Sequence, residues 1–267
     1  MPTTVSQRAL AALCDEAAPA APAAVATKRW TPVFIIASPR PLTGKTFLAR
    51  LVADFLRVDG GDVNVFDLSP EEGSIADLIP DLTSKADIQS TPGQVALFDR
   101  LILDDGTAKV VDLPHNVFER FFAVIGEIGF IDEAHRRTIE PVILYPADQH
   151  RISVQSYARL QGRFPGMVLV PVFNEGIIKG RKLRDQYPFD RAAAVPLQIP
   201  ALPPALKAYA ERSAHSFAEF YSQLPMSVPL GPAFELRAWT KRAFLEFREL
   251  ELRLLLEKLR SSLKGET

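Results

Sequence analysis

FIIASPRPLTGKTFLARLVADFL, residues Phe34 to Leu56, joins an apolar run to an amphipathic segment through a short loop. Gly44, Lys45 and Thr46 open the amphipathic segment, where the start of a helix leaves backbone N–H groups without partners. Such amides bind anions, a lysine ammonium can reach the β- and γ-phosphates of a nucleotide, and a threonine hydroxyl can ligate Mg²⁺. The pattern predicts a strand, a phosphate-binding loop (P-loop) and a helix. The alternative is a helix that only happens to begin with these residues.

The first half of the loop departs from the usual pattern GxxxxGK[ST], because Pro39 stands where the first glycine would be. Pro39 and Pro41 have no N–H to donate, and each pushes the preceding residue toward extended backbone. If one lost donor pointed at a phosphate, about 1.5–3 kcal/mol of binding free energy would go with it. The loop therefore predicts weak nucleotide binding. The residues expected to hold the phosphates are Leu42, Thr43, Gly44, Lys45 and Thr46.

The composition is that of an ordinary globular protein, with 267 residues, 47% hydrophobic and 24% charged. A net charge of −1 argues against a polyanion gripped by the whole surface. Cys14 is the only cysteine, which excludes an intrachain disulfide and a cysteine-based zinc site and fits a reducing cytoplasm. No apolar run approaches the ~18 residues of a membrane span.

Short apolar runs alternate with amphipathic segments after residue 29, as in repeated βα units on a parallel sheet. We expect a three-layer α/β P-loop domain with a mainly parallel sheet at 29–200. A disordered tag with an Ala/Pro linker should precede it at 1–28, and a helical extension should follow at 201–267. The expected strands are Val33–Ala37, Val63–Asp67, Lys109–Leu113, Pro141–Tyr145, Met167–Phe173 and Val195–Ile199. The expected helices are Lys45–Arg57, Thr91–Leu103, Val117–Ile128 and Val154–Phe164.

The extension contains a helical segment near Leu206–Gln223 and a long helical pattern over Phe234–Lys264. The apolar positions of the long pattern recur at intervals of three and four, which forms a seam. Two interpretations stay open: the seam docks on the chain's own domain, or it pairs two copies into a homodimer. Mixed charges on the other faces argue against a membrane-surface helix. The seam residues are Leu236, Trp239, Ala243, Phe247, Leu250 and Leu254.

Two aspartates end apolar runs that follow the loop. Asp112 ends Lys109-Val110-Val111, and Asp67 ends Val63-Asn64-Val65-Phe66. Carboxylates at strand ends beside a P-loop commonly hold Mg²⁺ and its water. Each aspartate could instead cap a turn.

Taken together, SPRPLTGKT, VNVFDLSPEEGSIADLI, KVVDLP and MVLVPVFNEG resemble the ParA/MinD family of deviant-Walker ATPases, which position plasmids, chromosomes and division sites. The similarity covers about Thr31 to Pro200. The layout is also similar to ParA-like proteins encoded in conjugal-transfer operons. The resemblance implies an ATP- and Mg²⁺-dependent dimer. Lys45 matches the phosphate-binding lysine, and Thr46 and Asp112 match the Mg²⁺ positions. Arg40 stands where the family has a lysine that acts across the dimer; a solvent-exposed loop arginine is the alternative.

Several residues depart from the family pattern. Pro41 and Leu42 replace paired glycines, and a leucine at positive φ costs roughly 1–2 kcal/mol. Ser69 replaces the second aspartate of an Asp-x-Asp that polarises the attacking water, and a hydroxyl cannot accept that proton near neutral pH. The resemblance therefore implies slow hydrolysis at best. Asn174 resembles the asparagine that family members place against the purine; a turn-forming asparagine is the alternative.

The expected function is a ParA/MinD-like nucleotide-dependent dimerising switch with slow ATPase activity. The alternative is a non-catalytic adaptor that binds a protein partner through its C-terminal helix. Non-specific DNA binding has weaker support, because it rests on one basic loop, and such a run of charges is more often a solvated surface loop. The histidines lack metal-ligand spacing and no serine lies in a nucleophile elbow. The basic residues of that loop are Lys179, Arg181, Lys182 and Arg184.

Overall fold

The computed structural model describes residues 30–58, 60–177, 188–189, 196–210 and 215–265. The linker expected at 1–28 and the basic loop expected to meet DNA lie outside these residues. The described chain is built on a seven-stranded sheet of order β3-β2-β4-β1-β5-β6-β7, in which every neighbouring pair is parallel. The strands are β1 Thr31–Ala37, β2 Val63–Asp67, β3 Thr83–Lys85, β4 Ala108–Leu113, β5 Ile139–Pro146, β6 Val168–Asn174 and β7 Leu197–Ile199.

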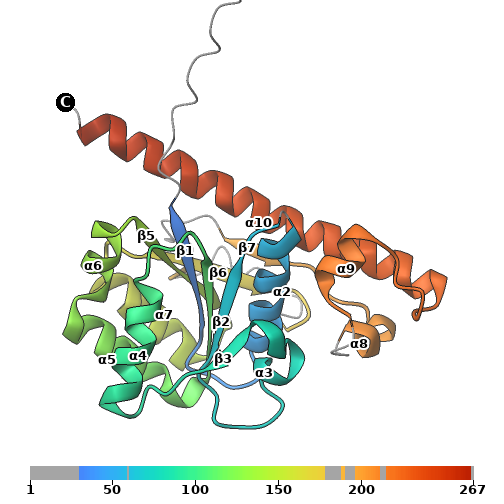
Figure 1. Cartoon of the computed structure of the whole chain (residues 1–267), viewed down its shortest axis with the longest axis horizontal. Helices are drawn as coiled ribbons and strands as arrows, with labels where there is room; N and C mark the ends of the chain where they lie inside the picture. Colours follow the sequence, from blue (N-terminus) through green and yellow to red (C-terminus); the bar gives the residue numbers. More distant parts are fainter. Residues whose placement is uncertain (1–29, 59, 178–187, 190–195, 211–214, 266–267) are drawn as a thin grey trace, which may run out of the picture.

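Helices cover both faces of the sheet, which confirms the three-layer α/β fold expected from the sequence (Figure 1). Side chains alternate along β1: Phe34 and Ile36 face one core, and Val33 and Ile35 face the other. The first core lies under α2 Lys45–Val58, α3 Ile75–Leu78, α8 Pro204–Ala210, α9 Phe217–Ser222 and α10 Leu230–Gly265. The second lies under α4 Thr91–Leu101, α5 Phe118–Ile128, α6 Phe130–Arg136 and α7 Arg151–Arg163.

Some elements differ from the prediction. The edge strand β3 was not predicted, because its sequence TSK is polar and none of its residues is buried. The helix α6 was also missed: Gly129, at φ 62°, ends α5, and a new helix begins at Phe130. The segment expected as one helix over Leu206–Gln223 contains two, because Ser216 caps a fresh start by accepting from the Glu219 amide at 3.0 Å. Two short 3₁₀ helices lie at Pro80–Leu82 and His115–Val117.

The C-terminal seam faces the chain's own domain. All the seam residues of α10 are buried, between 0 and 4% exposed, within the same core as α2 and α9. Trp239 of α10 packs against Phe47 of α2 and Phe217 of α9, with ring centroids 5.9 and 5.7 Å away. These residues are therefore unavailable for pairing two copies, and the docked interpretation is the correct one.

The strand order brings the expected site together at one edge of the sheet. Strand β1 lies between β4 and β5. The strands before β5 are added on one side of β1 and the later strands on the other, so the strand order reverses at β1. At such a switch point a crevice forms at the carboxyl ends of the strands. Asp112 of β4 is in register with Ile36 of β1 and with Asp67 of β2. The loop that follows β1 starts from this same edge. None of the helices in the described residues is both long and apolar enough to cross a bilayer.

Candidate functional site

The loop from Ser38 to Gly44 connects β1 to α2 and has an unusual backbone. Leu42 and Gly44 both have left-handed φ angles, of 58° and 78°. Glycine is needed at position 44 for space as well, since an added Cβ would lie 3.1 Å from Nδ2 of Asn174 and 3.2 Å from Cδ1 of Ile177. Leu42 has no such constraint, because its side chain is 95% exposed. The loop therefore keeps its shape although only one of these positions holds a glycine.

The backbone amides of residues 42 to 46 are available for an anion. Within the described part of the chain, no hydrogen bond joins any of them to a protein acceptor. Left-handed residues in a loop turn successive N–H groups toward one concave surface, which is a recurrent phosphate-binding arrangement. The N-terminus of α2 adds its partial positive charge at the same place.

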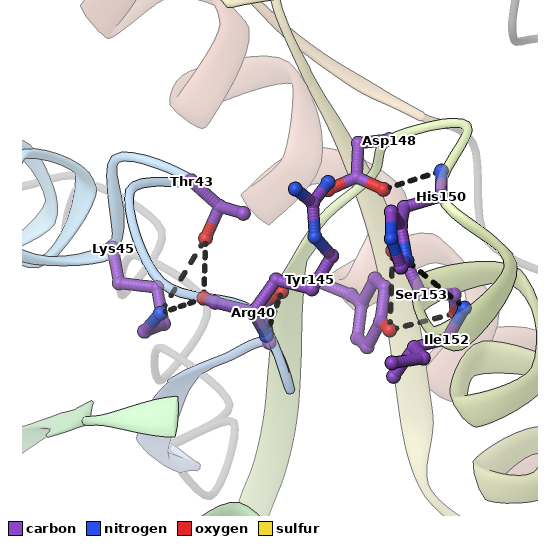
Figure 2. A network of polar contacts seen from close by, with 9 residues as sticks. Arg40, Thr43, Lys45, Tyr145, Asp148, His150, Ile152 and Ser153 are labelled. Carbon is purple, nitrogen blue, oxygen red and sulfur yellow. Dashed lines mark hydrogen bonds and ion pairs between the residues drawn. The ribbon is translucent and has the colours of Figure 1, made fainter. Parts of the chain in front are cut away.

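The Lys45 ammonium closes over this loop (Figure 2). Its Nζ donates to the Arg40 carbonyl at 2.6 Å and lies 3.5 Å from Oγ1 of Thr43. Burial lowers the pKa of Lys45 to about 8, whereas the nearby Asp112 carboxylate acts in the opposite direction. The ammonium thus holds the loop's own oxygens, which are the acceptors that a phosphate would replace.

Two aspartates lie behind the loop. Burial raises the pKa of Asp112 to about 6, a hydrogen bond from Thr46 lowers it, and the neighbouring Asp67 raises it further. Asp67 is fully buried, and its oxygens accept from the Ser69 amide at 2.9 Å and from the Ser74 hydroxyl. Thr46 and Asp112 therefore form the pair of oxygen groups beside the P-loop, while Asp67 is engaged by its own turn.

Arg40 makes an ion pair within the chain. Its Nη1 lies 2.7 Å from Oδ2 of Asp148, in the loop after β5, and Oδ1 of Asp148 accepts from the His150 amide at 2.8 Å (Figure 2). Sequence reasoning missed Asp148, because nothing local signals a partner 108 residues away. The available sign was its position two residues beyond the apolar strand that ends at Pro146. In this conformation Arg40 ties the P-loop to the loop that follows β5.

Asn174 ends β6 beside the loop. Its Oδ1 accepts from the Gly176 amide at 3.0 Å and its carbonyl accepts from the Ile177 amide, which is the pattern of a turn-forming asparagine. The adjoining crevice has no room for a water molecule in this conformation. A purine base would therefore need the crevice to widen. The crevice is lined by Thr43, Gly44, Phe47, Leu48, Pro146, Val172, Asn174 and Ile199.

Comparisons with known proteins add no identification. Neither the protein-family models nor the curated proteins that were searched include a match to this chain. Among the described residues, there is also no group of three or more His, Cys, Asp and Glu side chains that could hold a metal by themselves.

Proposed function

We propose that this chain is a nucleotide-dependent switch of the ParA/MinD type, which binds ATP with Mg²⁺ weakly, hydrolyses it slowly and dimerises. It would serve plasmid or DNA partition, mobilisation or another positioning task. The observation that supports this most is the grouping of Lys45, Thr46 and Asp112 with the amides of residues 42 to 46. These groups come from two strands and a helix start that meet at the switch point of a parallel sheet.

The residues present fit a magnesium nucleotide. Lys45 and the loop amides would hold the phosphates, while the hydroxyl of Thr46 and the carboxylate of Asp112 offer the oxygen ligands that Mg²⁺ prefers. Bound Mg²⁺ would neutralise charge on the phosphate oxygens. The role of Asp67 as a Mg²⁺ ligand stays a prediction. To coordinate the ion, Asp67 would have to give up the hydrogen bond from Ser69 or the one from Ser74.

Weak binding follows from the same contacts. Lys45 would have to release the Arg40 carbonyl, and Pro39 and Pro41 offer no amide to the phosphates. Arg40 could act across a dimer only after its ion pair with Asp148 opens. Ser69 has no carboxylate with which to accept a proton from the attacking water, so hydrolysis would be slow.

Calorimetric titration with ATP and Mg²⁺ tests the proposal. We expect binding heat for the natural sequence and an affinity at least about tenfold lower for Lys45→Ala, since a charge-assisted contact to phosphate is lost. Lys241→Ala is the matched control, because Lys241 is an exposed lysine on α10, and it should bind as the natural sequence does. No heat at millimolar nucleotide, or equal binding by Lys45→Ala, would contradict the switch.

A second candidate function is a non-catalytic adaptor that retains the scaffold and binds a protein partner through its C-terminal helix. The observation in its favour is the crevice beside Asn174, which is too narrow for a base in the present conformation. Titration with inorganic triphosphate distinguishes the switch from the adaptor, because triphosphate tests binding to the P-loop without requiring room for a base. An adaptor should bind neither triphosphate nor ATP.

A further inference from the structure

The helix α10 carries a second apolar face besides the docked seam. Five leucines of this face are exposed to between 41 and 58% of their surface. With 3.6 residues per turn, Leu252 lies about 160° around the helix from the buried Leu250. The helix is thus apolar on two opposite sides, and only one of them packs on the domain. The exposed leucine face consists of Leu245, Leu252, Leu255, Leu256 and Leu259.

The spacing of the exposed leucine face is that of a coiled coil. Leu245, Leu252 and Leu259 are seven residues apart, and Leu256 falls between the last two at intervals of four and three. A heptad spacing keeps one stripe of a helix against one stripe of a partner helix along the whole contact. From Leu245 to Leu259 the stripe is about 21 Å long. This regularity favours a helix as the occupant of the face.

The area of the face suits a pair of identical helices. The exposed leucines present on the order of 500 Å² per copy, which is as large as the largest apolar patch on a typical monomer. If all of this area were covered, a symmetric pair would bury about 1,000 Å² from the leucines, which is at the lower limit for a specific interface before the flanking residues are added.

The charges beside the leucines select the direction of pairing. Glu249 forms an ion pair with Arg253 at 2.8 Å, and Arg260 lies further along the same edge of the face. In a parallel pair in register, Glu249 would meet Glu249 of the partner subunit, which is repulsive. An antiparallel pair centred on Leu252 instead places Glu249 about 3 Å along the helix axis from Arg253 of the partner subunit. The two Arg253 side chains lie equally close to each other, and one Glu249 flanks each of them, so the four side chains form one charge-balanced network.

We propose that the exposed leucine face of α10 binds a second copy of this chain, with the two helices antiparallel. Leu245 would pack against Leu259 of the partner subunit, and Leu252 would lie at the twofold axis. The contact uses no residue of the P-loop, so it is independent of nucleotide and of the proposed switch. Both copies keep their docked seams, because these lie on the opposite side of each helix.

Light scattering with size-exclusion chromatography measures the assembly. The natural chain should elute at twice the 29.5 kDa mass of one copy, without nucleotide. Leu252→Glu should shift it to one copy, because the change places two like charges at the axis. Leu103→Glu is the matched control: Leu103 is 53% exposed outside α10, and this variant should stay dimeric. Circular dichroism checks that all three are folded.

The same measurement contains the outcomes that overturn the proposal. A monomeric natural chain would reject the interface, and so would a Leu252→Glu variant that remains dimeric. Lys45→Ala should stay dimeric whether or not it binds nucleotide; loss of the dimer in this variant would point to pairing through the P-loop instead. Failure of nucleotide binding with an intact dimer would affect only the proposed switch.

Engineered cysteines test the direction of the helices. In a Cys14→Ser background, Leu245→Cys and Leu259→Cys should cross-link to each other when the two variants are mixed and oxidised, and neither should cross-link alone. A parallel pair gives the opposite result, with each variant forming its own disulfide-linked dimer. That result would overturn the antiparallel arrangement.

Discussion

Leu42 holds a backbone conformation that leucine rarely adopts, with φ at 58°. A left-handed φ brings Cβ too close to the following carbonyl oxygen, which costs roughly 1–2 kcal/mol. Nothing in packing offsets this, because the side chain is 95% exposed. The neighbouring contacts of Lys45 and Thr43 with the Arg40 carbonyl fix the loop around this strained residue. The strain is therefore stored in the loop that we propose to bind phosphate.

Replacing Leu42 with asparagine should relieve part of this strain. Asparagine tolerates positive φ, so Leu42→Asn should raise the free energy of unfolding by up to about 1 kcal/mol. Urea denaturation followed by circular dichroism measures the change. Leu103→Asn removes another exposed leucine, at a position without positive φ, and should show no gain. A Leu42→Asn variant less stable than the natural chain would show that position 42 is not strained.

The residues that could be predicted are those with a local sequence signal. Lys45 and Thr46 follow from three adjacent letters, and Asp112 follows from its position at the end of an apolar run. The Arg40–Asp148 ion pair could not be predicted, since it joins residues that only the sheet brings together. The engagement of Asp67 by Ser74 depends on how the chain turns after β2, which no periodic pattern encodes.

Helix α2 links the P-loop to the C-terminal extension through buried charges. Arg50 donates to the Ala210 carbonyl at 2.7 Å and to the His215 carbonyl, and Asp54 accepts from the Phe217 amide at 2.7 Å. Burial raises the pKa of Asp54 to about 6, although the Phe217 amide and Arg50 act in the opposite direction. The extension is thereby tied to the helix that starts at Lys45.

The raised pKa of Asp54 predicts a pH dependence of stability. Because the folded pKa of about 6 exceeds the ordinary value of 3.8, folded protein binds the proton more tightly between these values. The free energy of unfolding should thus gain on the order of 2 kcal/mol from Asp54 as pH falls from about 6 to about 4. Asp54→Asn should lack this gain in urea titrations at several pH values. The control variant Asp81→Asn changes an exposed aspartate and should keep the gain in unfolding free energy. If the free energy of unfolding changed with pH in Asp54→Asn as it does in the natural chain, Asp54 would not be the group responsible.

The helices and strands, like the residues, divide into those that the sequence predicts and those whose placement depends on the complete fold. Strands β1, β2 and β4 were evident because buried parallel strands read as continuous apolar runs. The docking of α10 could not be decided from its sequence, since heptad spacing describes a seam equally well for its own domain and for a partner. Only the relative positions of α2, α9 and α10 distinguish docking on the chain's own domain from pairing with a partner. Those positions depend on the complete fold.

At the scale of the whole molecule, α10 completes the first core. Leu236, Ala243 and Leu254 lie in one cluster with Leu48 and Val52 of α2, over the same face of the sheet. Figure 1 shows the helix running across the domain from the side of α8 and α9 toward the side of α6. The helix is therefore part of the folded unit and not a tail that could be removed without cost.

The docked seam predicts a large cost for truncating one of its leucines. Leu250 is 3% exposed, so Leu250→Ala should leave a cavity and lower the free energy of unfolding by about 2–5 kcal/mol. Leu103→Ala removes the same atoms from a side chain that is 53% exposed, and should cost less than about 0.5 kcal/mol. Urea denaturation at several protein concentrations separates this effect from assembly, because the loss from Leu250→Ala should not depend on concentration. Equal small losses of unfolding free energy in both variants would mean that the seam of α10 does not pack on the sheet. The exposed leucine face would then be the side of the helix that packs on the domain.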